Sequence, residues 1–156
     1  MKNPSQPNNK YHQGLYVPKH PEKYVGRVDS IRYRSGWERK VMLWLDLGPE
    51  IKRWASEPFP IPYISPLDGR GHRYYFDFWL EKLNGTKYII EVKPYKQTIM
   101  PVLKESTRSA KKIEQYNYSA KNFIINTAKW KAAQEFCNRN EAKFLIITEK
   151  DLKLTD

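Results

Sequence analysis

Two apolar runs joined by Asn84-Gly85 constrain the fold of this chain more than any other feature of its sequence. An Asn-Gly pair between such runs is a strong signal for a tight β-hairpin turn. We therefore expect residues 72–80 and 87–93 to form paired antiparallel strands. The first strand contains Asp77, and the second ends in Glu91-Val92-Lys93. Charged side chains avoid buried strands unless they are paired or bind a metal ion, so these positions are candidates for a functional site.

Hairpin pairing is expected to bring the two acids together. Asp77 and Glu91 lie at similar distances from the turn, and Lys93 shares a strand face with Glu91 because side chains repeat every two residues. Two ionised carboxylates about 4 Å apart repel by roughly 4 kcal/mol at an effective dielectric near 20. A proton, a cationic side chain or a metal ion relieves that repulsion. An ordinary cross-strand salt bridge is the alternative interpretation.

A metal site would favour a hard ion. Carboxylate oxygens suit Mg²⁺ or Mn²⁺ better than zinc, and the Val92 carbonyl is a third candidate ligand. Lys93 would position a water molecule or stabilise negative charge on a phosphate. This combination predicts metal-assisted phosphodiester hydrolysis.

Glu38 is a further candidate, and its position allows two interpretations. Residues 35–47 are expected to form a helix, with apolar residues on one face and Gly48-Pro49 ending it. The pattern Ser35-x-x-Glu38 is typical of a capping box, worth about 1 kcal/mol. Glu38 can therefore cap the helix, join the acidic site, or do both.

The net charge and composition of the chain indicate which kinds of partner we expect it to bind. The 156 residues carry a net charge of +11, which favours polyanions such as nucleic acid. Residues 1–34 carry +5, residues 35–92 are neutral, and residues 93–150 carry +7. No apolar run is long enough for a membrane span. Cys137 is the only cysteine, as expected in a reducing cytoplasm.

The remaining pattern predicts an α/β protein with a mixed β-sheet flanked by helices. Residues 1–30 contain four prolines and are expected to form a basic arm, either solvated or in contact with nucleic acid, ahead of a domain at 31–156.

Other expected elements are an extended segment at 51–55, helices at 106–118 and 127–140 with Thr127 as a cap, an ambiguous segment at 123–126, and a strand at 144–148.

Together these residues resemble the PD-(D/E)XK nuclease superfamily, although Phe76 replaces the proline of its name. An ordered series of segments also looks like the head-completion nucleases of T-even-type tailed phages, and it is similar to the endonuclease subunit of some transposases. The segments are residues 33–38, 54–57, 61–66, 72–78, 91–94, 126–130 and 148–150.

The resemblance implies a restriction-endonuclease-like core and a Mg²⁺- or Mn²⁺-dependent DNA nuclease. It implies that Glu38, Asp77 and Glu91 bind the metal and that Lys93 is the catalytic lysine. It further implies action in phage head completion, on packaged DNA before head–tail joining, with head or portal–neck proteins as partners. The expected location is the host cytoplasm during virion assembly, with association with the virion as a further expectation.

Basic residues outside the acidic pattern are candidates for phosphate contacts. They are Arg32, Arg34, Arg73, Lys96, Lys111 and Lys112. Related nucleases use a further Gln or Lys on a later helix, and Gln97, Lys111 and Gln115 are the candidates here. A structural head-completion or DNA-end-binding protein that keeps a nuclease fold without turnover is the alternative function.

Overall fold

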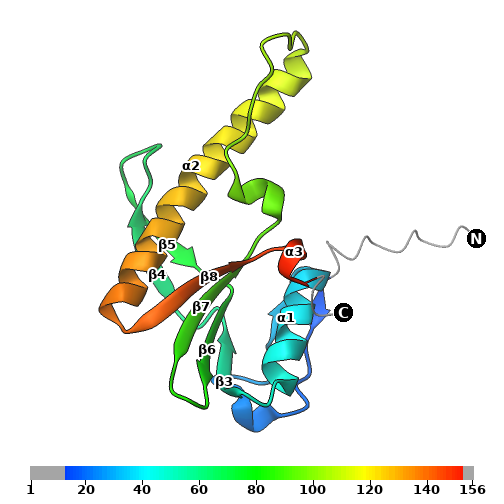
Figure 1. The fold of residues 1–156 in the computed structure, drawn as a ribbon, viewed down its shortest axis with the longest axis vertical. Coiled ribbons are helices and arrows are strands. Elements are labelled where there is room, and N and C mark those ends of the chain that lie inside the picture. Colours follow the sequence, from blue (N-terminus) through cyan, green and yellow to red (C-terminus); the bar gives the residue numbers. More distant parts are fainter. Residues whose placement is uncertain (1–12, 153–156) are drawn as a thin grey trace, which may run out of the picture.

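A four-stranded mixed sheet with a helix on each face forms the centre of the protein (Figure 1). The computed structural model describes residues 13–152. The sheet has the order β3 (Ile51–Ser56), β6 (Phe78–Lys82), β7 (Lys87–Val92) and β8 (Ala142–Ile147). The first two pairings are antiparallel, and β7 runs parallel to β8. Helix α1 (Gly36–Leu47) covers one face and α2 (Ala110–Arg139) covers the other. The predicted α/β class with a mixed sheet and flanking helices is confirmed.

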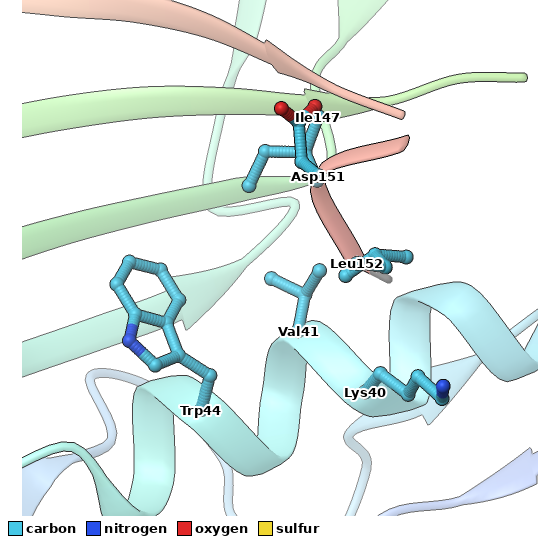
Figure 2. Close-up of a pocket in the computed structure, with 6 residues that line it drawn as sticks. All are labelled: Lys40, Val41, Trp44, Ile147, Asp151 and Leu152. Atoms are coloured by element: carbon cyan, nitrogen blue, oxygen red, sulfur yellow. The ribbon is translucent and has the colours of Figure 1, made fainter. Parts of the chain in front are cut away.

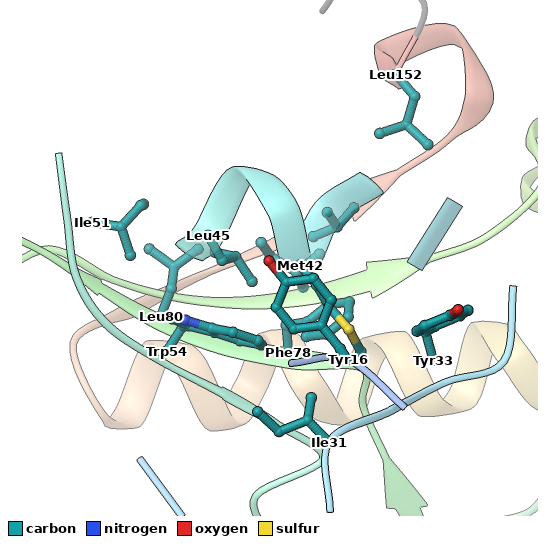
Figure 3. Close-up of a cluster of buried hydrophobic side chains, with 12 residues drawn as sticks. Tyr16, Ile31, Tyr33, Met42, Leu45, Ile51, Trp54, Phe78, Leu80 and Leu152 are labelled. Atoms are coloured by element: carbon teal, nitrogen blue, oxygen red, sulfur yellow. The ribbon is translucent and has the colours of Figure 1, made fainter. Parts of the chain in front are cut away.

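Alternation along the strands divides the apolar residues between two cores. On β7, Ile90 joins the core beneath α1, and its neighbour Ile89 joins the core beneath α2. Figure 3 shows the α1-side core, in which the fully buried Trp54 is the largest side chain. On the α2 side, Ala133 and Cys137 pack against strand residues. Both faces of the sheet are therefore covered.

The hairpin is confirmed. Asn84-Gly85 forms the turn, and Gly85 has a φ of +86°, which glycine adopts without steric cost. Across it, Leu80 pairs with Tyr88 and Phe78 with Ile90. This register places the residue before Phe78 opposite the residue after Ile90.

The expectation of one strand over 72–80 is wrong. Residues Gly71–Tyr75 form β5, which pairs with β4 (Pro60–Ile64) in a separate two-stranded sheet. The chain then passes through Phe76 and Asp77 before β6 begins. Phe76 is fully buried in the α2-side core, and the Asp77 carbonyl accepts the Glu57 N–H at 2.9 Å. These contacts direct the chain from one sheet into the other, so the break falls at the acidic residue.

The expected helices at 106–118 and 127–140 are one helix. α2 runs without interruption through 123–126, which the sequence left ambiguous. Thr127 is not a cap: its hydroxyl donates to the Phe123 carbonyl one turn earlier, at 2.7 Å. The cap is Ser109, whose side chain accepts the Lys112 N–H. No glycine or proline occurs within α2, so nothing in its backbone chemistry ends the helix midway.

Toward the two ends of the described chain, Ser35 and Thr148 form the helix caps that their local sequence favours. The Ser35 side chain accepts the Glu38 N–H at 3.1 Å and begins α1, as predicted. Short strands β1 (Gly14–Leu15) and β2 (Arg32–Tyr33) pair ahead of it. At the other end, Thr148 caps the short helix α3 (Glu149–Leu152).

Residues 13–30 lie on the core instead of forming a free arm. Tyr16 is buried, and Tyr24 packs edge-on against Trp54 with ring centroids 4.7 Å apart. A 3-10 helix, η2 (Pro21–Lys23), lies between these two tyrosines. The first twelve residues of the expected arm lie outside the described residues. The boundary between an arm at 1–30 and a domain at 31–156 therefore stays a prediction.

Asp46 fastens this N-terminal segment. It is fully buried and accepts hydrogen bonds from the Tyr16 hydroxyl at 2.7 Å and from the N–H groups of Lys19 and His20 at 2.7 and 2.9 Å. Burial by itself raises the pKa of Asp46, but these donors outweigh it and hold the pKa below its usual range.

Asp46→Ala should lower the free energy of unfolding by at least about 2 kcal/mol, because it leaves several buried donors without an acceptor. Urea denaturation measures this loss. Asp29→Ala is the control, since Asp29 is exposed and pairs only with exposed Arg27. Equal stability of the two variants would contradict the anchoring role of Asp46.

Candidate active site

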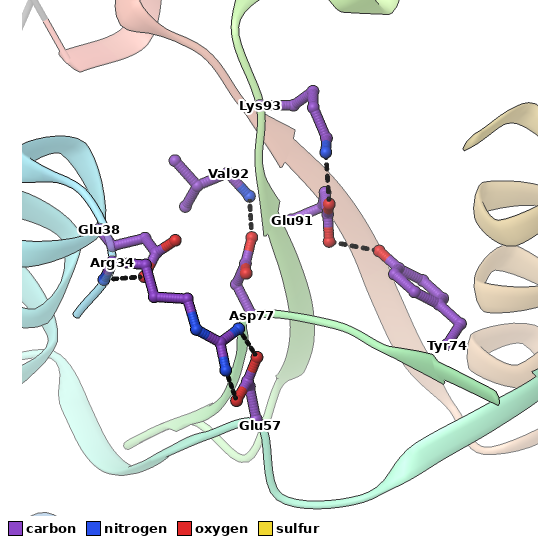
Figure 4. A network of polar contacts seen from close by, with 8 residues as sticks. All are labelled: Arg34, Glu38, Glu57, Tyr74, Asp77, Glu91, Val92 and Lys93. Carbon is purple, nitrogen blue, oxygen red and sulfur yellow. Dashed lines mark hydrogen bonds and ion pairs between the residues drawn. The ribbon is translucent and has the colours of Figure 1, made fainter. Parts of the chain in front are cut away.

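Three acidic residues converge where β7 leaves the sheet. Asp77 precedes β6, Glu91 lies near the end of β7, and Glu38 lies in the first turn of α1. Figure 4 shows Asp77 between Glu38 and Glu91. The charge of Asp77 interacts with those of both acids and with that of Lys93. The structure therefore brings together all five predicted catalytic and metal-binding positions, the four named here and Val92.

Glu91 is held by two neighbours. Its Oε2 accepts a hydrogen bond from the hydroxyl of Tyr74 on β5 at 2.5 Å. Its Oε1 lies 3.5 Å from Nζ of Lys93, the residue that follows the last residue of β7. Glu91 is buried, whereas the Lys93 side chain is about one quarter exposed. Lys93 is therefore the more solvent-accessible member of this ion pair.

Asp77 is fixed through the backbone of the opposite strand. Its Oδ2 accepts the Val92 N–H at 2.6 Å. Because the Asp77 carbonyl is also held by the Glu57 N–H, both the main chain and the side chain of Asp77 are constrained. The Val92 carbonyl as a metal ligand stays a prediction.

Glu38 combines capping with a place in the acidic centre. Its Oε2 accepts the N–H of Arg34 at 2.9 Å, so the returning bond of the predicted capping box goes to the residue before Ser35. The Arg34 guanidinium in turn binds both oxygens of Glu57, at 2.8 and 3.4 Å. This fork holds the residues that lead into α1, and Glu38 projects from the first turn of that helix.

Burial disfavours the ionised form of all three carboxylic acids. Burial, followed by the charge of Glu91, raises the pKa of Asp77 well above its usual value. Burial also raises the pKa of Glu91, although Lys93 and the Tyr74 hydroxyl oppose this, and it raises the pKa of Glu38. The pKa of Tyr74 is raised by burial and by the charge of Glu91, so its hydroxyl stays a donor.

The donor chemistry fits a hard divalent cation. All three side chains offer oxygen atoms, and a cation between them would relieve their mutual repulsion. Within residues 13–152 no three His, Cys, Asp or Glu side chains already form a compact metal-binding group. Each carboxylate instead accepts a hydrogen bond from the protein. An ion would therefore replace or share some of these bonds.

Two neighbours of the site escaped the sequence analysis. One is Tyr74, and the other is Lys129 on α2, whose Nζ lies 5.7 Å from the centre of the Tyr74 ring. Burial and then the charge of Lys93 lower the pKa of Lys129, while Glu91 opposes them. The sequence signal for Tyr74 was its position two residues before Phe76, a spacing at which strand side chains share one face; both residues are buried. Lys129 becomes recognisable only when 110–139 is treated as one helix.

The predicted phosphate-binding residues are all exposed, but they come from separate parts of the fold. Arg32 lies on β2, Arg73 on β5, and Lys96 on the 3-10 helix η3 (Tyr95–Thr98). Arg34 is engaged by Glu57. The other two, Lys111 and Lys112, begin α2, and the helper candidates Gln97 and Gln115 lie exposed on η3 and α2.

A separate hollow of about 280 Å³ lies between α1 and the C-terminal end of the described chain (Figure 2). Val41, Trp44, Ile147 and Leu152 supply most of its wall. It shares no residue with the acidic centre, so we do not assign it to the site. No helix within residues 13–152 combines the length and apolar character needed to cross a membrane.

Comparison with known proteins agrees with the resemblance found in the sequence. The head completion nuclease of Enterobacteria phage T4 is 39% identical over 142 residues, which cover 91% of this chain and 94% of that protein. The family model of the TnsA-like endonuclease N-terminal domain matches residues 48–149. That range contains Asp77, Glu91 and Lys93, and Glu38 lies before it. With most of its length matched, this chain belongs to the family of TnsA-like endonuclease N-terminal domains.

Proposed function

We propose that this protein is a divalent-metal-dependent DNA nuclease that acts in phage head completion. The convergence of Glu38, Asp77 and Glu91 beside Lys93 carries the proposal, because three carboxylates meet at one buried centre with the Lys93 amine 3.5 Å from Glu91. Membership of an endonuclease family supports cleavage of DNA.

The biological setting follows from the relative. The similar protein from phage T4 is named a head completion nuclease, and the high coverage of both chains supports the same role here. We propose that the substrate is packaged DNA before head–tail joining and that head or portal–neck proteins are partners. Action would take place in the host cytoplasm during virion assembly, with association with the virion as a further part of the proposal.

Glu38, Asp77, Glu91 and the Val92 carbonyl would hold Mg²⁺ or Mn²⁺. A bound ion supplies Lewis-acid stabilisation of the negative charge that grows on the phosphate during attack. The protein contributes orientation. Tyr74 and the Val92 N–H fix two of the carboxylates, and the Arg34–Glu57 pair holds the segment that leads into α1, whose first turn carries the third.

Lys93 would act on the reacting groups directly. In the hydrolysis, a water oxygen bonds to phosphorus while the bond from phosphorus to a sugar oxygen breaks, and that oxygen takes up a proton. Lys93 Nζ, 3.5 Å from Glu91, is placed to hold the water or to donate a hydrogen bond to a phosphoryl oxygen. Lys129 adds a second positive charge nearby.

Lys93→Ala should reduce cleavage of plasmid and linear DNA by about 10²-fold or more, because one donor to the developing charge is lost. Gel assays with Mg²⁺ or Mn²⁺ measure the rate. Lys87→Ala is the matched control, since Lys87 is exposed at the opposite end of the same strand.

Chelation with EDTA should stop cleavage by the wild-type protein. Chelator-resistant cleavage, or equal rates for the wild-type and Lys93→Ala proteins, would refute the mechanism. DNA binding that is insensitive to metal, without turnover, would instead identify a structural DNA-end-binding protein.

Glu38→Gln should separate capping from catalysis. Glutamine still accepts the Arg34 N–H, so the free energy of unfolding should change by less than about 1 kcal/mol, while cleavage should fall strongly because the negative charge is lost. Ser35→Ala should show the opposite pattern, with a loss of about 1 kcal/mol and near-normal cleavage. Identical profiles for the two variants would leave Glu38 with the capping role alone.

Asp77→Asn should raise the melting temperature in EDTA at neutral pH by a few degrees, since about 1 kcal/mol shifts Tm by roughly 2–4 °C in a chain of this size. The raised pKa means that ionised Asp77 destabilises the folded state, and asparagine can still accept the Val92 N–H. Differential scanning fluorimetry measures both proteins.

The pH dependence of the stability difference between the wild-type and Asp77→Asn proteins tests the direction of the Asp77 pKa shift. Well below the usual Asp pKa of 3.8, Asp77 is protonated in both the folded and the unfolded state and contributes no electrostatic difference. As pH rises toward the raised folded-state pKa, the wild-type protein loses stability and the advantage of Asp77→Asn grows. Mg²⁺ should stabilise the wild-type protein more than the variant. A lower Tm for Asp77→Asn at neutral pH would contradict this account.

A further inference from the structure

One face of α2 is polar along most of its length. Six residues recur at the i, i+4, i+7, i+11, i+15 and i+18 positions that define one side of a helix. They are Lys111, Gln115, Tyr118, Asn122, Asn126 and Lys129. Four of the six positions, from Lys111 to Asn122, lie in the first half of the helix, and the helix projects beyond the sheet at its N-terminal end (Figure 1). Within α2 the buried residues are Ala133 and Cys137, both in the other half.

The polar face of α2 reaches the acidic centre at its Lys129 end. Lys129 Nζ lies 5.7 Å from the ring centre of Tyr74, and the Tyr74 hydroxyl donates to Glu91. The Lys129 end of this face is therefore one route by which a DNA strand held at the carboxylates can leave the site. From Lys129 to Tyr118 the helix rises about 16 Å, at 1.5 Å per residue. That length corresponds to roughly five stacked nucleotides.

At Gln115 and Tyr118 the polar face borders a hollow between η3 and α2. Its volume is about 520 Å³, within the range of about 300–1,000 Å³ typical of sites for small ligands. It is lined by Lys96, Glu114, Gln115, Tyr118 and Ser119. Tyr118 is 70% exposed, so its ring is available for stacking. Lys96 lies three residues after Lys93 in the sequence. The hollow is therefore close along the chain to the proposed catalytic lysine.

The surrounding charge selects a polyanion. Residues 93–122 contain seven Lys or Arg and two Glu. Exposed Met100 and Val102 lie in the same stretch, but pairing with a second copy would bring two such basic segments together. Side-chain amides on the face offer donors and acceptors to base edges, and an exposed aromatic ring can stack only on a base that has left a duplex.

We propose that the polar face of α2 and the hollow beside η3 form a binding track for single-stranded DNA next to the cleavage site. Tyr118 stacks on an unpaired base, Lys96 contacts a phosphate, and Gln115 contacts a base edge. Glu114 opposes a phosphate in the hollow, but a carboxylate accepts hydrogen bonds from exocyclic amino groups of bases. The inference rests on the proposed nuclease function, since it concerns the path of the same DNA.

Fluorescence anisotropy in EDTA tests the track without turnover. The probes are a labelled blunt duplex and the same duplex with a single-stranded extension of about eight nucleotides, a typical site size for such tracks. Wild-type protein should prefer the extended DNA. Tyr118→Ala should weaken binding to the extended DNA by roughly five- to hundred-fold and leave blunt-duplex binding nearly unchanged. Tyr118→Phe keeps the ring and should bind like the wild-type protein.

Salt dependence tests the phosphate contact separately. Lys96→Gln should reduce the slope of log K against log salt for the extended DNA by about 0.7. Lys87→Gln, at the far end of β7, should leave the slope unchanged. Circular dichroism checks that each variant keeps its helix content.

Equal affinity of Tyr118→Ala and wild-type protein for the extended DNA would overturn the track, and so would a wild-type protein that binds blunt and extended DNA alike. The two proposals fail separately. Cleavage that depends on Lys93 but not on Tyr118 would remove the track alone. Tyr118-dependent binding without metal-dependent cleavage would support the track and refute the nuclease function.

Discussion

The pairing of β6 with β7 determines where the acidic centre forms. Phe78 lies opposite Ile90, and this register sets Asp77 opposite Glu91. It also sends Phe78 and Ile90 into the core beneath α1, while Ile89 enters the core beneath α2. A slip of one residue would reverse every side chain on the strand and expose apolar residues on both faces. Burial of the two cores therefore stabilises the arrangement that brings two carboxylates together.

Packing makes this electrostatically unfavourable arrangement possible. The Val92 N–H and the Tyr74 hydroxyl hold Asp77 and Glu91, and Lys93 pairs with Glu91 at 3.5 Å. These partners lower the pKa values without restoring them to the usual range, because burial outweighs them. The centre is thus rigid before any ligand arrives and keeps a residual attraction for cations. Such preorganisation is what electrostatic catalysis requires of a protein.

Features encoded by neighbouring residues could be predicted from the sequence, and features set by distant contacts could not. The Asn84-Gly85 turn and the Ser35 cap depend on local chemistry, and both were predicted. The break at Asp77 depends on the burial of Phe76 against α2 and on the Glu57 N–H, which no local pattern reveals. Thr127 has the chemistry of a cap, yet inside α2 its hydroxyl bonds to the preceding turn. Tyr74 and Lys129 were missed because they reach Glu91 and Lys93 from other elements.

The continuity of α2 has the widest consequence for function. Two separate helices would leave the projecting segment free to move relative to the sheet. One helix of thirty residues spans about 45 Å, and its second half is anchored by Ala133 and Cys137 in the core. Lys129 beside the acidic centre and Tyr118 in the hollow consequently belong to one rigid element. Their separation is fixed by helix geometry, so a DNA strand that contacts both is held at a set distance from the carboxylates.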